Sequence, residues 1–350
     1  MDEDGIKLTS YFGERRRVDG EFVGNALVDL YRQREVAASI LLRGTEGFGL
    51  KHHIRTNHSL TLSEDLPLTA IAVDTSARIK AVLDETRRIN TRGLITLERA
   101  RFLSAEIEPL VLPETTDEAA KLTVYFSRQD TVFQVPAFEV MCELLHRRSV
   151  DGATALAGVD GATHGHRQRA HLFTRNADVP MMVVAIAEKK SIGTILPEIA
   201  DLLRHARMTL ERVRICKRDG QLIDEPEMPP PYDDEGVALW QRLTVYASAD
   251  ARHDGQPIHR ALIRRLLSAG ISGATTQPGI WGYHGEHAPH GDQHLIQLGR
   301  HVPAVTTVLG APQSIPTAFS VIDELTAERG LVTCENVPII LRSENDRPLQ

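Results

Sequence analysis

The sequence contains no run of about 18 consecutive apolar residues, which is the minimum that a membrane-spanning helix needs. Its first residues, MDEDGIKLTS, also lack the positively charged and apolar regions of a signal peptide. Both absences argue against membrane insertion and against secretion. We therefore expect a cytoplasmic protein.

Cysteine is also scarce, and the sequence has no excess of positive charge. Cys142, Cys216 and Cys334 are the only cysteines in 350 residues, and none belongs to a C-x-x-C pair. This spacing fits reduced thiols in apolar positions better than a disulfide framework or a zinc knuckle. The formal net charge of -7 provides no basic surface for a phosphate backbone, so we expect no nucleic-acid partner.

The usual sequence signatures of catalysis are missing as well. No G-K-[ST] follows the glycines of GVDGATHGH, which excludes a P-loop there, and no G-x-S-x-G elbow occurs. Acidic residues near the first loop could supply acid–base groups, but nothing places a nucleophile beside them. We expect a protein that is not an enzyme.

The most informative feature that is present is an internal repeat. KLTSYF at 7–12 returns as KLTVYF at 121–126 and as RLTVYA at 242–247. When the sequence is aligned with itself, further positions coincide: Gly44 with Gly158 and Gly279, Gly47 with Gly161 and Gly282, His52 with His166 and His287, and Glu98 with Glu211 and Glu335. Three units of about 100 residues therefore share one layout.

Each unit shows the same order of expected elements. In the first unit, alternation over IKLTSYF predicts a strand, and an apolar stripe with helical spacing predicts a helix over about 20–35. The strand ASILLRG, a glycine-containing loop, the strand PLTAIAVD, a helix over about 76–89 and the strand LITLERARF follow. This βαββαβ order predicts an α+β, ferredoxin-like domain with two helices on one face of a four-stranded antiparallel sheet.

The other face of each sheet must also be covered. Lys7, Thr9 and Tyr11 alternate with Leu8 and Phe12, so both faces of the first strand carry bulky side chains. We expect sheets of different units to pack together, because a ring of three copies around a pseudo-threefold axis closes every sheet face. The chain would then be a monomeric, intramolecular pseudo-trimer.

Composition indicates where the units begin and end. Residues 106–119 and 218–240 are rich in proline and acidic residues and show little periodicity, which is typical of linkers. The predicted domains are 1–105, 120–217 and 241–342, followed by a tail at 343–350. Trp240, at the edge of the second linker, is expected to pack against a neighbouring unit.

The segments YFGERRRVDG, LLRGTEGFG and LSEDLP resemble the PII-like signal-transduction family, in the branch named domain of unknown function 190. The resemblance is close over 6–103 and weaker over 120–217 and 241–342. It implies three tandem copies of a subunit that generally forms trimers and holds small ligands, typically adenine nucleotides, in clefts between subunits. Members of this branch are often associated with membrane transport. The resemblance therefore implies a regulatory sensor that binds a small anionic effector and signals to a protein partner, for example a membrane transporter.

Glycine, arginine and acidic residues mark the first unit as the best candidate for such a site. Glycines permit a ligand to approach the backbone closely, and guanidinium groups suit a phosphate or a carboxylate. The candidate ligand-binding residues are Glu14, Arg43, Gly44, Glu46, Gly47, Gly49, Arg55, Glu98, Arg101 and Arg214. Tight turns, solvated arginines and capping carboxylates are the alternative interpretations of these residues.

The three units differ at several of these positions. Arg101 recurs as Arg214 but is replaced by Pro338, so the third unit has lost a cationic group. If the clefts bind anions, we expect them to be unequal. Glu98 and its counterparts could contact a ligand, or they could form ion pairs between units.

The aligned histidines His52, His166 and His287 allow a different interpretation. Three imidazoles around a common axis could bind a metal ion with an open fourth position, as in some zinc sites. They could also border separate clefts or lie exposed in loops, because no H-E-x-x-H pattern is present. Histidine-based metal binding or metal-dependent hydrolysis is therefore a second hypothesis, and a scaffold without a ligand is a third.

Overall fold

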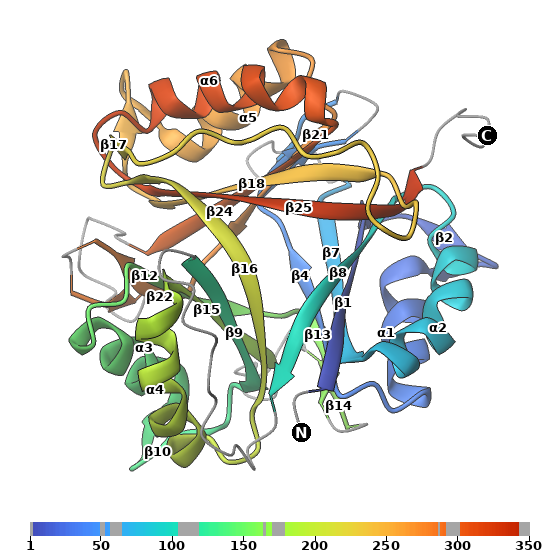
Figure 1. The fold of residues 1–350 in the computed structure, drawn as a ribbon. Coiled ribbons are helices and arrows are strands. Elements are labelled where there is room, and N and C mark those ends of the chain that lie inside the picture. The colour runs from blue at the N-terminus through green and yellow to red at the C-terminus, as the bar shows by residue number, and fades with distance from the viewer. Residues whose placement is uncertain are drawn as a thin grey trace.

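The computed structural model describes residues 3–49, 53–56, 65–103, 119–163, 166–169, 179–285, 288–291 and 302–342. It has a mixed α+β architecture in which the helices lie on the outside and the long strands meet in the centre (Figure 1). We call residues 3–103 unit 1, residues 119–222 unit 2 and residues 239–342 unit 3. No helix within the described ranges is long and apolar enough to cross a membrane.

Unit 1 has the strand and helix order that its sequence pattern predicts. Its long elements are β1 (Glu3–Gly13), α1 (Val23–Gln33), β4 (Ala38–Arg43), β7 (Pro67–Thr75), α2 (Ser76–Ile89) and β8 (Leu94–Leu103). Two short hairpins lie between them, formed by β2 (Arg17–Val18) with β3 (Glu21–Phe22) and by β5 (Glu46–Phe48) with β6 (Arg55–Thr56). The strand order is β4-β7-β1-β8, and every neighbouring pair is antiparallel.

Units 2 and 3 repeat this arrangement. Unit 2 contains β9 (Ala119–Ser127), β10 (Thr131–Val132), β11 (Val135–Pro136), α3 (Ala137–Arg147), β12 (Gly152–Ala157), β13 (Asp160–Thr163), β14 (His166–Arg169), β15 (Pro180–Glu188), α4 (Lys189–Leu202), β16 (Arg207–Arg218) and β17 (Gln221–Leu222). Unit 3 contains β18 (Leu239–Ser248), β19 (Arg252–His253), β20 (Gln256–Pro257), α5 (Ile258–Ser268), β21 (Gly273–Pro278), β22 (Trp281–His284), β23 (His290–Gly291), β24 (Pro303–Gly310), a 3-10 turn η1 (Pro312–Ser314), α6 (Ile315–Leu325) and β25 (Leu331–Arg342). Their strand orders, β12-β15-β9-β16 and β21-β24-β18-β25, match that of unit 1.

One face of each sheet packs against its own two helices. In unit 1, Leu8 and Phe12 of β1 share a core with Leu27 of α1 and Ile79 of α2, as the alternation in IKLTSYF predicts. Complete burial of one such side chain stabilises the fold by about 1.5–3 kcal/mol. The residues that alternate with these, Lys7, Thr9 and Tyr11, therefore face away from the helices toward the other units.

The cysteines belong to these packed interiors. Cys142 lies in the core of unit 2, and Cys216 lies beside Cys334 in the core of unit 3. All three are buried and free of disulfide bonds. The prediction of reduced thiols in apolar positions is therefore confirmed. Burial also raises the pKa of the Cys142 thiol, which keeps it in the unreactive protonated form.

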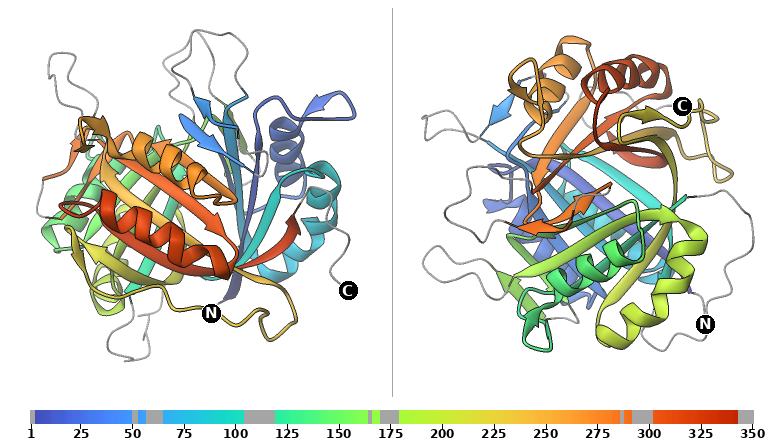
Figure 2. Two further views of the ribbon diagram at one scale, coloured as in Figure 1. Left: turned by 90° about the horizontal axis from the view of Figure 1, so that it is seen from above. Right: turned by 90° about the vertical axis from the view of Figure 1, so that its left-hand side faces the viewer.

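Strand pairing joins each unit to both of the others. The short strand after the second long strand of one unit pairs with the second long strand of another: β5 with β21, β13 with β4, and β22 with β12. The last long strands, β8, β16 and β25, also pair with one another. These contacts run in a cycle, and the further views in Figure 2 show the helices of each unit on the outer surface around it. Sheet edges that would otherwise be exposed are thus covered within one chain.

The aligned glycines Gly47, Gly161 and Gly282 make this exchange possible. Each lies in the short strand that pairs with another unit, where the partner backbone comes very close. A Cβ at Gly47 would lie 2.6 Å from the carbonyl oxygen of Ala274, and one at Gly161 would lie 2.3 Å from that of Ser39. Any side chain would therefore push two units apart, which explains why glycine recurs at this position in all three units.

Candidate functional site

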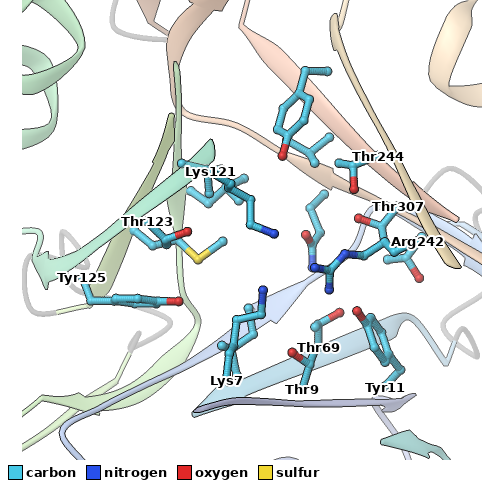
Figure 3. A pocket seen from close by; sticks show the side chains of 18 residues that line it. Lys7, Thr9, Tyr11, Thr69, Lys121, Thr123, Tyr125, Arg242, Thr244 and Thr307 are labelled. Atoms are coloured by element: carbon cyan, nitrogen blue, oxygen red, sulfur yellow. The ribbon is translucent and has the colours of Figure 1, made fainter. Parts of the chain in front are cut away.

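The repeated K/R-L-T-x-Y segments line one central cavity. Side chains at alternate positions point into it from all three units, and Figure 3 shows the Lys7, Lys121 and Arg242 side chains extending toward one another. Thr9, Thr123 and Thr244 follow, and Tyr11, Tyr125 and Tyr246 come next along each strand. The repetition of these segments in the sequence therefore reflects a shared inner wall.

Six buried charges surround the cationic end of this cavity. We call them the charge ring: Lys7, Glu98, Lys121, Glu211, Arg242 and Glu335. Each cation contacts the glutamate of its own unit, with N–O distances of 2.6 Å for Lys7, 3.1 Å for Lys121 and 2.9 Å for Arg242. Each also contacts the glutamate of another unit: Lys7 binds Glu211, Lys121 binds Glu335, and Arg242 binds Glu98.

The ring holds two of its carboxylates in the ionised form against a large desolvation cost. Burial disfavours the ionised form of Glu98, but Arg242 and Lys7 outweigh it and hold the pKa of this carboxyl well below 4.5. The pKa of Glu335 is lowered in the same way, against burial, by Arg242 and Lys121. Breaking one partner in such a group is costly because it leaves a buried charge unpaired. The ring therefore ties the three units together, as an ion-pair role for Glu98 predicts.

Metal binding at this ring is disfavoured by the same contacts. Oxygen atoms of Glu98, Glu211 and Glu335 lie within 4.8 Å of one another, a spacing that could suit a hard cation. Lys7, Lys121 and Arg242 already neutralise these carboxylates, so a metal ion would have to displace them. The three histidines proposed from the sequence give no support either: His166 is exposed at the start of β14, while His52 and His287 lie outside the described residues.

A second and larger opening lies between unit 1 and unit 3. This cleft has a volume of about 130 Å³ and is bordered by β1, by the hairpin β5–β6, and by the start of β8 in unit 1. Unit 3 contributes Trp240 at the start of β18, residues 272–275 around the start of β21, and Leu309 of β24. The cleft therefore lies next to the first glycine-containing loop and between units, where the family resemblance implies a ligand site.

Basic groups from separate segments converge on the cleft. Arg16, His53, Arg55 and Arg92 line it, and its described lining contains no Asp or Glu. Arg55 forms an ion pair with Asp65 at 3.1 Å, whereas neither Arg16 nor Arg92 forms an ion pair with any described residue. Excess positive charge beside an opening of this size favours an anionic ligand.

Aromatic side chains form the apolar part of the cleft. Tyr11 and Phe48 approach from unit 1, and Trp240 approaches from unit 3. Trp240 is held in place by Leu309 and Val337, with which it forms a small buried cluster. The expectation that Trp240 packs against a neighbouring unit is confirmed, since Tyr11 packs against the same cluster. A flat or apolar ligand group can lie against these rings.

The structure brings only part of the sequence-based candidate set to this cleft. Gly49 and Arg55 line it. Arg43 is exposed and forms an ion pair with Glu14 at 2.9 Å, so neither side chain is directed into the cleft. Gly44 does not line it, and a Cβ there would lie 2.8 Å from Pro67 and 2.9 Å from Thr275 of unit 3.

Glu46, Glu98 and Gly47 have structural positions between units. Gly47 pairs with β21, and Glu98 belongs to the charge ring. The Glu46 side chain is buried, and burial raises its pKa although Arg260 and Arg264 of α5 oppose the shift. None of the three lines the cleft, because each faces the contact with another unit.

Arg101, another candidate ligand-binding residue, lies away from this cleft. Arg101 lies near the end of β8, whereas the cleft is bordered by Leu94 at the beginning of that strand. At about 3.3 Å per residue the two positions are roughly 23 Å apart. Arg214 is likewise elsewhere: it forms ion pairs with Asp224 and, at 2.7 Å, with Glu227, in the segment that follows unit 2.

Arg16, Arg92 and Trp240 are among the lining residues that the sequence did not single out as ligand-binding candidates. Arg16 stands within the quoted segment YFGERRRVDG, so its identity was visible, but one of three adjacent arginines cannot be singled out from sequence. Arg92 precedes β8 in a turn, and Trp240 belongs to another unit. The pairing of β1 with β8 brings the two arginines to one end of unit 1, and the packing of unit 3 on unit 1 adds Trp240.

The loop cations of unit 2 are already neutralised. Arg167 of β14 forms ion pairs with Asp160 at 2.6 Å and with Asp29 of unit 1 at 2.9 Å. Arg169, the counterpart of Arg55, lies 3.5 Å from Asp160. Asp130 stands where unit 1 has Arg16. The surroundings of the unit 2 loop therefore differ in charge from the cleft between units 1 and 3.

Comparison with known proteins agrees with the internal repeat. A family model for domain of unknown function 190, described as an uncharacterized conserved family, matches residues 5–102, 119–215 and 240–339. The chain belongs to this family. Domain of unknown function 190 is a PII-like family, so the resemblance found in the sequence is confirmed. Three tandem copies of the domain of unknown function 190 account for most of the chain.

One relative has a length close to that of a single unit. A UPF0166 protein of Aquifex aeolicus (strain VF5) is 28% identical over 99 residues, which make up 28% of this chain and 90% of that protein. Among solved structures, a proposed glycine cleavage system transcriptional repressor is 11% identical and covers 60% of this chain and 96% of its own, with a TM-score of 0.19. An unknown protein from Galdieria sulphuraria is 8% identical and covers 60% and 99%, with a TM-score of 0.18. TM-scores of this size carry no argument about function.

Proposed function

We propose that this protein is a PII-like regulatory sensor that binds a small anionic effector in the cleft between units 1 and 3 and signals the bound state to a protein partner. An adenine nucleotide is the first candidate effector. The observation that carries the proposal is the convergence of Arg16, Arg55, Arg92 and His53 on an opening with aromatic walls and no acidic residue in its described lining. Phosphates would meet the guanidinium groups, and a purine would lie against the rings.

We further propose that the chain is a fused, cytoplasmic counterpart of a trimer, with domains at 1–105, 120–217 and 241–342. Two observations support this. The Aquifex relative is about as long as one unit, and the strand exchange between units runs in a cycle. Fusion permits the three clefts to differ, and Asp130 in place of Arg16 is one such difference.

The partner is proposed to recognise the loop between β5 and β7 in unit 1, whose described residues Gly49, His53 and Arg55 line the cleft. A ligand can change the state of this loop only through a difference in its affinity for two loop conformations. A membrane transporter is the class of partner that the family resemblance implies. Protein–protein contact with such a transporter requires no membrane-spanning segment in this chain.

Calorimetric and thermal-shift titrations test the effector. The panel is ATP, ADP, AMP, cyclic AMP, adenosine and inorganic phosphate, added to the full chain. We expect at least one adenine nucleotide to raise the melting temperature once its concentration passes its dissociation constant. Adenosine lacks the phosphate groups and inorganic phosphate lacks the purine, so both should bind more weakly.

A matched pair of variants assigns the site. Arg92 lines the cleft, and Arg329 is its exposed counterpart in unit 3. Arg92→Ala should weaken nucleotide binding by about tenfold or more, the effect of losing a hydrogen bond to a charged group. Arg329→Ala should leave binding unchanged. The absence of any nucleotide response, or equal losses in both variants, would contradict the proposal.

A further inference from the structure

The central cavity is lined by positively charged side chains, and the ion pairs of the charge ring alone do not explain this. It has a volume of about 80 Å³, which exceeds the 10–15 Å³ that one water molecule needs. Lys7, Lys121 and Arg242 line it, but none of its 18 lining residues is Asp or Glu. The carboxylates of the ring therefore lie behind the cations, and the cavity itself faces positive groups.

In each unit, the cationic side chain of the ring has one N–H that does not bond to a ring glutamate. The ammonium groups of Lys7 and Lys121 each have three N–H bonds and contact two glutamates. The guanidinium of Arg242 has five and directs four hydrogen bonds to Glu98 and Glu335. The fifth N–H of Arg242 is taken by the Tyr11 phenol, so among the described contacts one donor of Lys7 and one of Lys121 remain at the cavity wall.

Hydroxyl groups extend this set of donors. Burial raises the pKa of Tyr125 and of Tyr246, so both phenols keep their protons at neutral pH and can donate. The Thr69 hydroxyl lies at the cavity wall, is buried, and has no hydrogen-bond partner among the described residues. A buried hydroxyl without a partner is costly, so an occupant that accepts hydrogen bonds would stabilise this wall.

We infer that the central cavity is a binding site for a monovalent inorganic anion of the size of a halide or nitrate. Such an ion accepts hydrogen bonds and donates none, which matches a wall with spare cationic N–H groups and hydroxyls. The charge ring is neutral as a whole, so a single negative charge is favoured over a double one, whose burial costs more. This site is distinct from the proposed nucleotide cleft and does not depend on it.

The cavity is reached through the cleft. Fifteen of the 18 lining residues are buried, and the three that are not are Tyr11, Thr275 and Thr307. The same three residues also line the cleft between units 1 and 3. An anion that enters from solvent therefore passes this point, and a ligand in the cleft would lie over the entrance.

Bromide is the probe that tests the site, because its anomalous scattering distinguishes it from water. Crystals of the full chain grown in sodium bromide should show an anomalous peak in the cavity next to Lys7, Lys121 and Arg242. In solution, sodium bromide should raise the melting temperature relative to sodium gluconate at equal ionic strength, because gluconate is too bulky for the cavity. A cavity that holds only water in bromide crystals overturns the inference, as does a peak in crystals without any response in solution.

Two threonines provide a matched control. Thr69 and Thr333 are both buried, and neither hydroxyl has a hydrogen-bond partner within the described chain, but only Thr69 lines the cavity. Thr69→Val should weaken the bromide response about tenfold or more, and Thr333→Val should retain it. Equal responses in the two variants overturn the inference. Arg92→Ala acts on the cleft and should leave the bromide response intact, so failure of the nucleotide proposal would be seen separately.

Discussion

Arg242 of unit 3 donates two hydrogen bonds to the carboxylate of Glu98 in unit 1, from Nη1 to Oε1 at 2.8 Å and from Nη2 to Oε2 at 2.6 Å. Both side chains are almost completely buried, at 6% and 5% exposure. This paired geometry fixes distance and orientation together, which a single lysine contact does not. It shows how the chain holds its first and last units together by a contact that only the folded state can make.

Removal of one partner from the charge ring should destabilise the whole chain. Glu98→Gln leaves Lys7 with only Glu211 and Arg242 with only Glu335, so the buried ring carries one uncompensated positive charge, and we expect the free energy of unfolding to fall by about 3–5 kcal/mol. Urea denaturation measures this loss. The adjacent Arg99 is the control, since its ion pair with Glu235 is 73% and 62% exposed. Arg99→Ala should cost about 0–1 kcal/mol, and similar losses in both variants would mean that the ring contributes little.

The charge ring should also make the free energy of unfolding depend on pH in the acid range. The pKa values of Glu98 and Glu335 are lowered in the folded protein, so the unfolded chain binds their protons first as the pH falls. Their contribution to the free energy of unfolding is complete above pH 4.5 and is lost as the pH falls below this value. Each such carboxyl adds about 1.4 kcal/mol per pH unit to the slope of unfolding free energy in that window. Denaturation series between neutral and acid pH should therefore show a shallower slope in Glu98→Gln, and an unchanged slope would contradict the shifts.

The sequence predicts the order of strands and helices in each unit but not the cleft between units, and particular residues show why. Alternation of Lys7, Thr9 and Tyr11 with Leu8 and Phe12 has a period of two, so it predicts two covered faces without any knowledge of the partner. The threefold recurrence of this pattern in the sequence then predicts three similar units. A cleft between units is different, because Arg92 and Trp240 meet only through packing over a long sequence separation.

Arg101 illustrates the second difficulty. A sequence pattern places this residue in the last strand of unit 1 but does not show which end of that strand borders the loop. The antiparallel pairing of β1 with β8 decides this, since Tyr11 lies opposite Leu94 and Asp4 lies opposite Arg101. Tyr11 and Leu94 therefore border the cleft, and Arg101 lies at the far end. Registers of this kind depend on long-range pairing, which local propensity does not specify.

Glycine at the strand exchange should be essential for stability. In Gly161→Ala the new methyl group would lie 2.3 Å from the carbonyl oxygen of Ser39, in the backbone of another unit. We expect a loss of about 1–3 kcal/mol, the usual cost of overpacking, measured by urea or thermal denaturation. Gly49→Ala is the control, because no atom of the described residues, apart from its chain neighbours, lies within 4 Å of its added carbon, and it should change stability by less than about 0.5 kcal/mol. A tolerated Gly161→Ala would show that units 1 and 2 are not held in the described register.

Tryptophan fluorescence should report the cleft directly. Trp240 lines the cleft, whereas Trp281 lies in β22 and packs edge-on against Phe138 of unit 2, with ring centroids 6.3 Å apart. If a nucleotide base lies against the aromatic wall, it should change the emission of Trp240, because stacking alters the surroundings of the indole ring. The Trp281→Phe chain should therefore keep most of the emission change caused by ATP, and the Trp240→Phe chain should lose it. Calorimetry on both variants provides the control for binding itself. A change that persists in Trp240→Phe and disappears in Trp281→Phe would place the ligand beside unit 2 and refute the location proposed for the cleft.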